Sequence, residues 1–471
     1  MPAPPMPRAP DQVLTVAQMR AAEQALIDAG TSVDALMQVA GQGAAEWVWR
    51  IAAKRPVTVL CGPGNNGGDG YVIAEAIRAR GGAVCVIAAC DPATAAAANA
   101  RALYQGSVLG PDADTKGDVL VDCLFGSGLT RPLTVAHIAL LRRLAASHGT
   151  RIAIDVPSGV ESDSGAALNA GLPEFSLTVA LGAWKYAHFL MPAAAKAGAV
   201  RLVGTGVAAL GDAAQVLRQP RLSAPAADAH KYRRGLLGVI GGEMPGAAVL
   251  ACLAAQGAGA GYVKLLGEAG GFNSADLVSD ATPLLAVLED RRWAALLIGP
   301  GLGRHDISMQ RLGLALAAGV PTVVDADALM LLMLEMIVGH PATLVATPHE
   351  GELVALERAF ACGSAGSRAE RARTLAVASG MVIVAKGPDT VIAAPDGRTA
   401  FAPRASSWLS TAGTGDVLAG TIASRLACGV EAFTAACQGV WLHGEAARLA
   451  GPVFTASQLA ASLRSAYAAC L

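Results

Sequence analysis

The sequence predicts an α/β protein built from parallel sheets with helices on both faces. The first observation is that short apolar runs alternate along the chain with alanine-rich stretches of helical composition. These runs are apolar on both faces, which is typical of strands buried inside a parallel sheet. The second observation is the length of 471 residues. It exceeds the usual domain size of about 100–200 residues and therefore indicates two or three domains.

The first series of elements opens with a capping-box pattern, in which Thr15 precedes Gln18 at the start of a predicted helix. Apolar runs then predict strands at 57–61, 83–88, 118–122 and 151–156. The stretches between them predict helices at 70–80, 93–104 and 135–147.

The second series of elements begins after residue 222. Apolar runs predict strands at 236–240, 294–298, 320–324, 343–346 and 381–385. The segment 213–230 between the two series mixes proline, alanine and polar residues, so we place the domain boundary near 218–222. The two expected domains are therefore residues 1–218 and 223–471.

Charge, cysteine usage and hydropathy exclude several classes of protein. The 36 basic and 37 acidic residues give a net charge of −1, which provides no basic face for a nucleic acid. The nine cysteines are scattered and never form C-x-x-C, which favours reduced thiols in the cytoplasm and argues against a zinc site. Prolines in residues 1–10 exclude a signal peptide and predict an unordered tail. The uncharged stretch 244–263 is interrupted by proline and glycine, so it predicts a buried helix and a turn rather than a membrane span.

Residues 61–70, CGPGNNGGDG, place five glycines directly after a predicted strand. Glycine-rich loops at the carboxyl ends of parallel strands bring backbone N–H groups close to anionic ligands. The side chains of Asn65, Asn66 and Asp69 add donors and acceptors. The spacing is neither G-x-G-x-x-G nor that of a P-loop, so we expect a ligand-binding turn of another type before a helix that begins near residue 71.

Two further strand ends of this half carry aspartates. Asp122 ends one predicted strand and Asp155 ends the next. Each aspartate alone is typical of a helix cap, but strand ends that converge on one sheet edge form a pocket. Carboxylate, hydroxyl and carbonyl oxygens there suit a hard cation such as potassium or magnesium.

Seven segments of this half together resemble the NAD(P)H-hydrate epimerase domain over residues 11–210. They are LTVAQMRAAE, LMQVAG, CGPGNNGGDGYVIA, DVLVDCLFGSGLTRPL, IAIDVPSGV, GAWKYA and AGAVRLVGTGV. The combination of N-N-G-G-D with D-V-P-S-G is the most specific part, while Gln38 departs from the glutamate that many relatives have. The resemblance implies a Rossmann-like three-layer sandwich that binds a damaged dinucleotide, with a potassium ion nearby.

The resemblance also implies which residues form that site. The hydrate-binding residues would be Asn65, Asn66, Gly67, Gly68, Asp69, Gly126, Ser127, Gly128, Leu129, Thr130, Arg131, Pro132 and Asp155. Potassium would be held by Asn66, Asp122 and Ser158. Asp155 is the catalytic candidate and shapes the site with Asp122, but the sequence does not assign the residue that transfers a proton.

The second half carries its own candidate site in TAGTGDVLAG, residues 411–420. Small residues at the start of an apolar helix leave backbone N–H groups free to bind an anion, and the helix dipole favours negative charge there. Asp416 could take a proton from a hydroxyl that attacks a phosphate. A lysine–glycine turn at 386–387 and His349, after a predicted strand, face the same expected cleft.

The segments GPGLG, DADAL, TPHEGE, KGPDT and GTGDVLAG resemble ribokinase-like kinases. More closely, residues 223–470 resemble the ADP/ATP-dependent NAD(P)H-hydrate dehydratase. That resemblance implies a ribokinase-like three-layer sandwich. It implies substrate binding by Ala260, Gly303, His349 and Asp416. It implies nucleotide binding by Lys386, Gly387, Pro388, Asp389, Thr390 and Gly415. Ala412, Ser406 and Glu243 depart from the residues common in relatives.

Both resemblances together imply a bifunctional enzyme of nicotinamide nucleotide repair, an isomerase fused to a lyase. It would epimerise NADHX and NADPHX, the hydrates of NADH and NADPH, and dehydrate the S form at the expense of ADP or ATP. Asp416 would be the general base, with K⁺ at the epimerase site and Mg²⁺ beside the nucleotide. We expect small-molecule partners only, no nucleic acid and no membrane, a homo-oligomer, and a cytoplasmic location.

Two alternatives remain open from the sequence. The second half could instead be a kinase for a vitamin precursor that releases a stable phosphorylated product, beside a nucleotide-binding N-terminal module. The first half could also be a sensing or scaffolding module without activity. Phosphorylated product would favour the first alternative, and binding without epimer exchange would favour the second.

Overall fold

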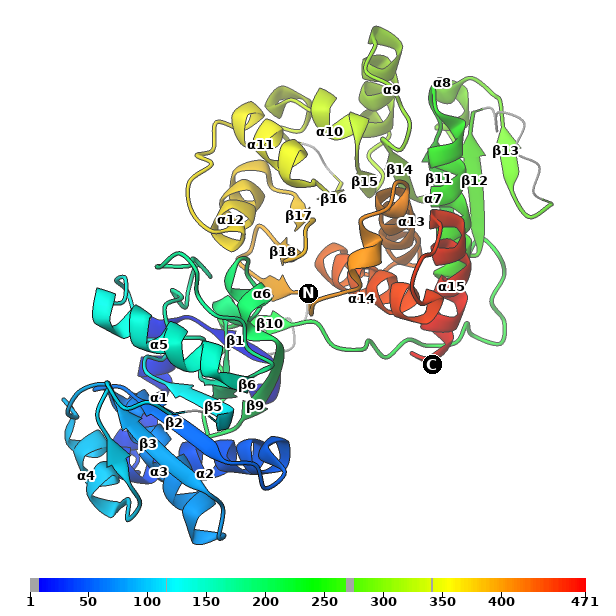
Figure 1. The fold of residues 1–471 in the computed structure, drawn as a ribbon. Coiled ribbons are helices and arrows are strands. Elements are labelled where there is room, and N and C mark those ends of the chain that lie inside the picture. Colours follow the sequence, from blue (N-terminus) through cyan, green and yellow to red (C-terminus); the bar gives the residue numbers. More distant parts are fainter. Residues whose placement is uncertain (1–7, 116, 268–274, 340–341) are drawn as a thin grey trace. The chain divides into compact units, whose positions relative to one another are not determined.

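The chain divides into two units, Met1–Gln215 and Val216–Leu471, each built around its own sheet of mainly parallel strands (Figure 1). The computed structural model describes residues 8–115, 117–267, 275–339 and 342–471. This arrangement confirms the predicted α/β class.

The sheet of the first unit has the strand order β4-β3-β2-β5-β6-β7-β9, with all neighbours parallel. Its strands are β2 (Val57–Cys61), β3 (Val84–Ala88), β4 (Val108–Leu109), β5 (Gly117–Cys123), β6 (His148–Ile154), β7 (Leu177–Leu181) and β9 (Ala199–Val203). Three short strands lie outside this seven-stranded sheet, and the first of them pairs with the other two: β1 (Gln12–Leu14), β8 (Trp184–Lys185) and β10 (Ala214–Val216).

Helices cover both faces of this sheet and make a three-layer sandwich. They are α1 (Val16–Asp28), α2 (Val33–Ala52), α3 (Asn65–Ala79), α4 (Ala95–Leu103), α5 (Val135–Ser147) and α6 (Ala193–Ala197), with 3-10 turns η1 (Ala9–Asp11) and η2 (Tyr186–His188). One apolar core joins α2, α3 and α4 to one sheet face through residues such as Val59 and Val121. A second core joins α5 to the other face through Leu60 and Leu120.

The sheet of the second unit is parallel up to β17 and continues through two antiparallel strands, in the order β13-β12-β11-β14-β15-β16-β17-β18-β19. Its strands are β11 (Leu236–Ile240), β12 (Tyr262–Leu266), β13 (Val278–Asp280), β14 (Trp293–Ile298), β15 (Thr322–Val324), β16 (Leu344–Ala346), β17 (Val382–Ala385), β18 (Val391–Ala393) and β19 (Thr399–Phe401). Each strand expected in this half is present, with bounds within two residues of those predicted.

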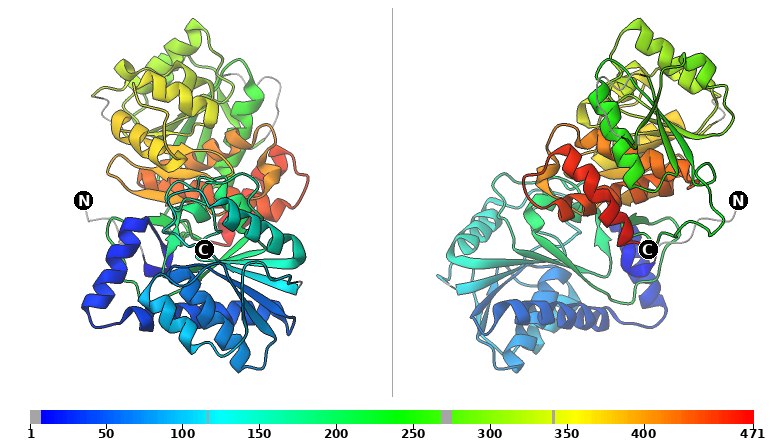
Figure 2. Two further views of the ribbon diagram at one scale, coloured as in Figure 1. Left: turned by 60° about the vertical axis from the view of Figure 1, so that its left-hand side comes forward. Right: turned by 90° about the vertical axis from the view of Figure 1, so that its right-hand side faces the viewer.

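Helices lie on both sides of this second sheet as well (Figure 2). They are α7 (Pro245–Gly257), α8 (Leu284–Val287), α9 (Asp306–Ala317), α10 (Asp327–Leu331), α11 (Glu350–Ala359), α12 (Arg368–Ser379), α13 (Thr414–Ala427), α14 (Ala432–Ala450) and α15 (Ala456–Ala468), with 3-10 turns η3 (Leu334–Met336) and η4 (Ser407–Leu409). A large core joins α7, α13 and α14 to alternate strand residues such as Val239 and Leu297. Their neighbours Ile240 and Ile298 are buried too, as a sheet covered on both faces requires.

The glycine-rich turn of the first unit differs from the prediction, because helix α3 begins at Asn65 rather than near residue 71. Three of its five glycines, at 67, 68 and 70, are therefore helical, although glycine costs up to about 1 kcal/mol against alanine in a helix. Close packing explains them. A Cβ on Gly67 would lie 1.9 Å from the carbonyl oxygen of Gly62, and one on Gly70 would lie 2.7 Å from Sγ of Cys61.

The N-terminal residues differ in part from the prediction, whereas the long apolar stretch of the second unit agrees with it. The predicted unordered tail is wrong for its last residues, because Ala9–Asp11 forms a 3-10 turn, and residues 1–7 lie outside the described residues. Within the stretch 244–263, Pro245–Gly257 forms the buried helix α7, as predicted, and strand β12 begins at Tyr262 after a short turn. None of the described helices is long and apolar enough to cross a bilayer. The nine cysteines are free thiols.

Candidate active sites

The start of helix α3 is open toward the carboxyl end of the first sheet. Its N-cap is Gly64, whose lack of a side chain leaves the first-turn N–H groups without a side-chain cap. Beside it, Thr94 donates a hydrogen bond to Oδ1 of Asn65 over 2.8 Å. A helix N-terminus with free N–H groups favours an anionic ligand such as a phosphate.

The three residues expected to hold potassium fall into one region of this site. Asp122 is fully buried at the end of β5 and accepts hydrogen bonds from the backbone N–H and the hydroxyl of Ser158, at 3.0 and 2.8 Å. Burial raises the pKa of Asp122 to about 6, against the lowering effect of these hydrogen bonds. The amide nitrogen and oxygen of Asn66 are both buried, and neither has a hydrogen-bond partner among the described residues. A buried amide without a hydrogen-bond partner and a buried carboxylate in this region suit the oxygen ligands of a hard cation.

Asp155 is held by contacts on both its side chain and its backbone. Its Oδ1 lies 2.5 Å from Nζ of Lys185, whose side chain is 1% exposed. Its Oδ2 accepts a hydrogen bond from the backbone N–H of Ser127 over 2.9 Å. Its carbonyl oxygen accepts from Nε2 of His188 over 2.7 Å. Its backbone is left-handed, with φ of 68°, which is uncommon outside glycine and typical of functional sites.

The carboxylates of this site have opposite protonation tendencies. Burial by itself would raise the pKa of Asp155, but Lys185 and the hydrogen bonds from Ser127 hold it below its ordinary value. Burial raises the pKa of Asp69 well above its ordinary value, and the charges of Asp155 and Glu23 add to that rise. Two carboxyl groups whose pKa values are pushed apart are typical of acid–base sites.

In the second unit, a lysine lies among several carboxylates. Nζ of Lys386 is 2.7 Å from Oδ1 of Asp325 and 3.8 Å from Oε2 of Glu352. The hydroxyl of Thr347 donates to the same oxygen of Asp325 over 2.6 Å. Burial alone would lower the pKa of Lys386, but Asp325 and Glu352 raise it above its ordinary value. The ammonium therefore stays charged in a largely buried place.

Asp416 lies in the first turn of α13, as the sequence predicted. Burial raises its pKa to about 7, and the charge of Asp325 adds to this rise while Lys386 opposes it. A Cβ on Gly415 would lie 3.6 Å from Nζ of Lys386, so the ammonium is next to the start of this helix. Gly413, with φ of 88°, is the N-cap and leaves the helix N–H groups without a side-chain cap. The arrangement combines a carboxylate poised near neutral pH, a cation and an open helix N-terminus.

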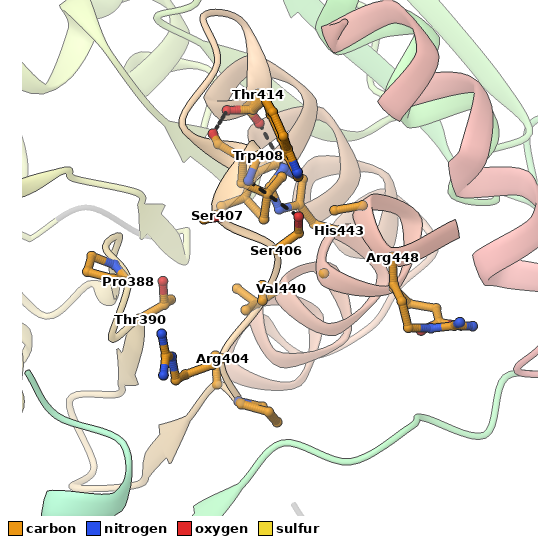
Figure 3. A pocket seen from close by; sticks show the side chains of 18 of the residues that line it. Pro388, Thr390, Arg404, Ser406, Ser407, Trp408, Thr414, Val440, His443 and Arg448 are labelled. Atoms are coloured by element: carbon orange, nitrogen blue, oxygen red, sulfur yellow. Dashed lines mark hydrogen bonds and ion pairs between the residues drawn. The ribbon is translucent and has the colours of Figure 1, made fainter. Parts of the chain in front are cut away.

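A cavity of about 1080 Å³ lies beside this helix start. Figure 3 shows Pro388, Thr390 and Arg404 on one side of it and Trp408 and Thr414 on another. The expected nucleotide-binding residues that line the cavity are Lys386, Gly387, Pro388, Thr390 and Gly415. Such a volume is at the upper end of the usual range for small-molecule sites, about 300–1,000 Å³.

Asp389 does not line this cavity but joins a network of ion pairs behind it. It is 5% exposed, and its Oδ1 lies 2.9 Å from Nε of Arg368. Arg368 also donates to the carbonyl oxygen of Lys386 over 3.0 Å and pairs with Glu350. The arginine therefore ties the lysine–glycine turn to helix α12.

The four expected substrate-binding residues of this unit are only partly brought together. Nδ1 of His349 accepts hydrogen bonds from two backbone N–H groups and so caps α11, and its Nε2 is 3.3 Å from the Glu352 carboxylate beside Lys386. Gly303 donates its N–H to Asp327 over 3.0 Å. The partners in these two contacts, Glu352 and Asp327, are both near Asp416, because the charges of both raise the pKa of Asp416.

Ala260 lies apart from the other three. Its N–H donates to Oγ of Ser424 over 2.9 Å, near the C-terminal end of α13. The eight residues from Asp416 to Ser424 span about 12 Å along a helix. The structure therefore does not bring Ala260 to the cluster around Lys386.

Two of the departures from the family pattern have visible roles. The hydroxyl of Ser406 caps the turn η4 by accepting from the N–H of Trp408 over 3.3 Å. The carboxylate of Glu243 lies 3.2 Å from Nε2 of His305 and close to Gly303. Nothing in the structure explains the alanine at 412.

Sequence reasoning missed several residues that surround these sites: Glu23, Lys185, His188, Asp325, Asp327, Glu352 and Arg368. Five of them, Glu23, Lys185, Asp325, Asp327 and Glu352, lie inside segments that the sequence had singled out, LTVAQMRAAE, GAWKYA, DADAL and TPHEGE. A lysine placed directly after an apolar strand was the available signal for Lys185. Nothing in the sequence distinguished Arg368 from other surface charges.

Comparison with known proteins covers both units. Residues 33–187 match the family model of the YjeF-related protein N-terminus, and residues 237–468 match that of NAD(P)H-hydrate dehydratase. The chain is 32% identical to the bifunctional NAD(P)H-hydrate repair enzyme of Mycobacterium leprae, with 97% of this chain and 99% of that one covered. It is 34% identical to the enzyme of the same name from Gloeobacter violaceus, over 91% and 92% of the two chains.

Among solved structures, the chain is 27% identical to the ADP/ATP-dependent NAD(P)H-hydrate dehydratase from Bacillus subtilis co-crystallised with ATP and Mg²⁺. That likeness has a TM-score of 0.47 and covers 53% of this chain and 95% of the other. Each family model matches one of the two units, and the full-length relatives cover both. The chain therefore belongs to the family of bifunctional NAD(P)H-hydrate repair enzymes.

Proposed function

We propose that the chain restores hydrated NADH and NADPH in two steps, one for each unit. The first unit interconverts the R and S epimers of the hydrate. The second unit uses ADP or ATP to remove water from the S epimer. The observation that carries this proposal is the group formed by Asp416 and Lys386 at the start of α13, beside a cavity large enough for a nucleotide.

The chemistry proposed for the second unit is phosphorylation followed by elimination. Asp416 accepts the proton of the ring hydroxyl as its oxygen attacks the terminal phosphorus of the nucleotide, which leaves shortened by one phosphate. Lys386 and the N–H groups of residues 413–415 stabilise the charge on the transferred group. The phosphate then leaves the ring carbon, and the neighbouring carbon releases a proton. The carbon–carbon double bond of the reduced nicotinamide is thereby restored.

The second unit offers a place for the nucleotide, but its described residues form no metal site of their own. Among residues 8–115, 117–267, 275–339 and 342–471, no three His, Cys, Asp or Glu side chains are grouped so that they could hold a metal ion. We infer that Mg²⁺ arrives with the phosphates, as it does in many phosphoryl-transfer sites. When bound, the ion would offset the negative charge of those phosphates.

In the first unit, the proposal places potassium at Asn66, Asp122 and Ser158. The orphaned amide of Asn66 and the buried carboxylate of Asp122 support this assignment, because a hard cation prefers oxygen ligands. The ion would supply a fixed positive charge next to the hydrate. The hydrate itself is proposed to bind across the start of α3 and the loop of Gly126 and Ser127, beside Asp155. A homo-oligomer and a cytoplasmic location remain predictions.

One experiment tests the whole proposal. The purified chain is mixed with both hydrate epimers, Mg²⁺, K⁺ and either ADP or ATP, and the ultraviolet absorbance of the reduced nicotinamide ring is followed. We expect complete recovery of the absorbance together with one free phosphate per hydrate consumed. A stable phosphorylated product instead of free phosphate would contradict the dehydration step and favour the kinase alternative.

A further inference from the structure

Lys185 is a buried charge that the proposed chemistry does not yet use. It lies on the short strand β8, its side chain is 1% exposed, and its Nζ also donates to the carbonyl oxygen of Leu181. Burying an ammonium is unfavourable unless a partner compensates for the lost hydration. An apolar side chain of similar length would fill the same space without that cost. The charge therefore calls for an explanation beyond packing.

The explanation lies in the closed set of contacts between Lys185, Asp155 and His188. The backbone N–H of Lys185 donates to Nδ1 of His188 over 2.9 Å, and Nε2 of the same ring donates to the carbonyl oxygen of Asp155. Nζ of Lys185 forms an ion pair with Oδ1 of Asp155, which closes the set of contacts. Each ring nitrogen of His188 thus has a hydrogen-bond partner. Burial lowers the pKa of His188 to about 4, so the ring stays neutral.

The other oxygen of Asp155 points to the expected substrate loop. Oδ2 accepts from the N–H of Ser127, and a Cβ on Gly126 would lie 3.0 Å from this oxygen and 3.3 Å from Cγ of Asn66. The carboxylate therefore lies between Lys185 on one side and the Gly126, Ser127 and Asn66 group on the other. Rotation about its side-chain bonds would break contacts on both sides.

We propose that Lys185 is a positioning residue for epimerisation, which fixes the carboxylate of Asp155 against the loop of Gly126 and Ser127. This inference rests on the proposed function of the first unit. The side chain of Lys185 is buried against Asp155. In this proposal, Lys185 does not contact the hydrate and acts through the aspartate alone. The lowered pKa of Asp155 agrees with this role, because burial without Lys185 would favour the protonated form.

The first test replaces the buried ammonium by an apolar chain of similar length. In the absence of nucleotide, conversion of the R hydrate of NADPH to the S form is followed by chromatography with the full-length Lys185→Met variant. We expect kcat for epimerisation to fall about 10²-fold, because a misplaced catalytic group costs about that much, while KM changes little. Dehydration of the S epimer by the same sample, with nucleotide added, should be unchanged and shows that the second unit is intact.

The matched control is Lys196→Met, which removes a surface lysine of the same unit that pairs with Glu174. It should epimerise like the parent. If the parent chain itself leaves the R hydrate unchanged, the proposed function of the first unit falls. If the parent interconverts the epimers and Lys185→Met does so at the same rate, the function stands and the positioning role is overturned.

The second test separates positioning from folding. Lys185→Met alone leaves a buried carboxylate without its partner, whereas Lys185→Met combined with Asp155→Asn leaves no unpaired charge. We expect the double variant to unfold at a higher temperature than Lys185→Met but to epimerise no faster than Asp155→Asn alone. Equal rates for Asp155→Asn and the double variant support action through Asp155. A double variant about 10²-fold slower than Asp155→Asn would show an independent role and overturn the proposal.

Discussion

The two units contain similar lysine–aspartate pairs that differ in how many carboxylates lie within ion-pair distance of the lysine. Lys185 forms an ion pair with one carboxylate, that of Asp155, at 2.5 Å and almost without solvent, while Glu23 and Asp69 feel its charge from farther away. Lys386 is also close to its aspartate, Asp325, at 2.7 Å, but Glu352 and Asp416 draw on the same positive charge. In the first unit the lysine keeps its aspartate ionised. In the second unit, Asp325 already balances most of the positive charge of Lys386.

This difference explains why the two catalytic candidates have opposite pKa shifts. Asp155 is held below its ordinary pKa, whereas the pKa of Asp416 is raised to about 7 by burial and by Asp325. A permanently ionised carboxylate can orient and stabilise groups, but it is a weak base. A carboxylate that titrates near neutral pH is a better acceptor for the proton of a hydroxyl. Similar pairs of residues can thus serve different chemistry when the number of neighbouring charges changes.

The sharpest test of this comparison is Asp416→Asn. Asparagine keeps the size of the side chain but cannot accept the proton, so dehydration should fall about 10²–10⁴-fold. Epimerisation should be unchanged, and nucleotide should still bind. Asp306→Asn, in the exposed first turn of α9, is the matched control and should retain both activities. A dehydration rate within about tenfold of the parent would refute the assignment of Asp416 as base.

A second test asks whether the first unit depends on a cation as well as on its lysine. Asp122→Asn should weaken epimerisation about 10–100-fold at limiting potassium, since metal sites lose affinity by about this much when their carboxylate support is altered. Added potassium should restore part of the rate, and dehydration should be unaffected. The exposed Asp118 lies on the same strand, so Asp118→Asn serves as the control. Unchanged epimerisation in Asp122→Asn would place the ion elsewhere.

The pH profiles should separate the two units within one sample. Only the ionised form of Asp416 accepts a proton, so kcat for dehydration should rise about tenfold per pH unit in acid and level off above about 7. Asp155 is already ionised across this range because its pKa is lowered. The contribution of Asp155 to epimerisation should therefore stay flat where dehydration is still rising. A dehydration profile without an inflection near neutral pH would contradict this account of Asp416.

The smallest expected effect concerns Arg368, which ties the turn after β17 to helix α12. Arg368→Ala removes its bond to the carbonyl oxygen of Lys386 and its ion pair with Asp389, so KM for the nucleotide should rise about 2–10-fold. The dehydration kcat should change less than KM. Arg373→Ala, on the exposed side of the same helix, is the control. Equal KM values in the two variants would show that the turn holds its shape without Arg368.

The sequence predicted the layers of both units because strand and helix periodicity depends on local burial. Strands such as Val57–Cys61 and Leu236–Ile240 were predicted with the bounds that the structure has. The start of α3 was wrong, because tertiary packing requires glycine at 67 and 70 and outweighs the low helix propensity of glycine. Local composition could not show that packing.

The sequence predicted candidate site residues only within recognisable motifs. The charges of Asp416 and Lys386 interact at the start of α13, but Asp389 turns away from the cavity and Ala260 is distant from the cluster. Lys185 was not predicted, because its meeting with Asp155 depends on how the chain returns after β7. Contacts between residues thirty positions apart follow from the fold and not from sequence spacing.

At two strand ends, neighbouring stretches of backbone pass so close to each other that they limit which substitutions these sites can accept. A Cβ on Gly62, after β2, would lie 1.8 Å from the carbonyl oxygen of Leu124, after the neighbouring strand. In the second unit, a Cβ on Gly299 would lie 1.7 Å from that of Asp325. No rotamer relieves such a clash, because every other amino acid carries the same atom. In a saturation library these two codons should tolerate no replacement, so laboratory evolution toward other nucleotides or hydrates must proceed through the loop residues around them.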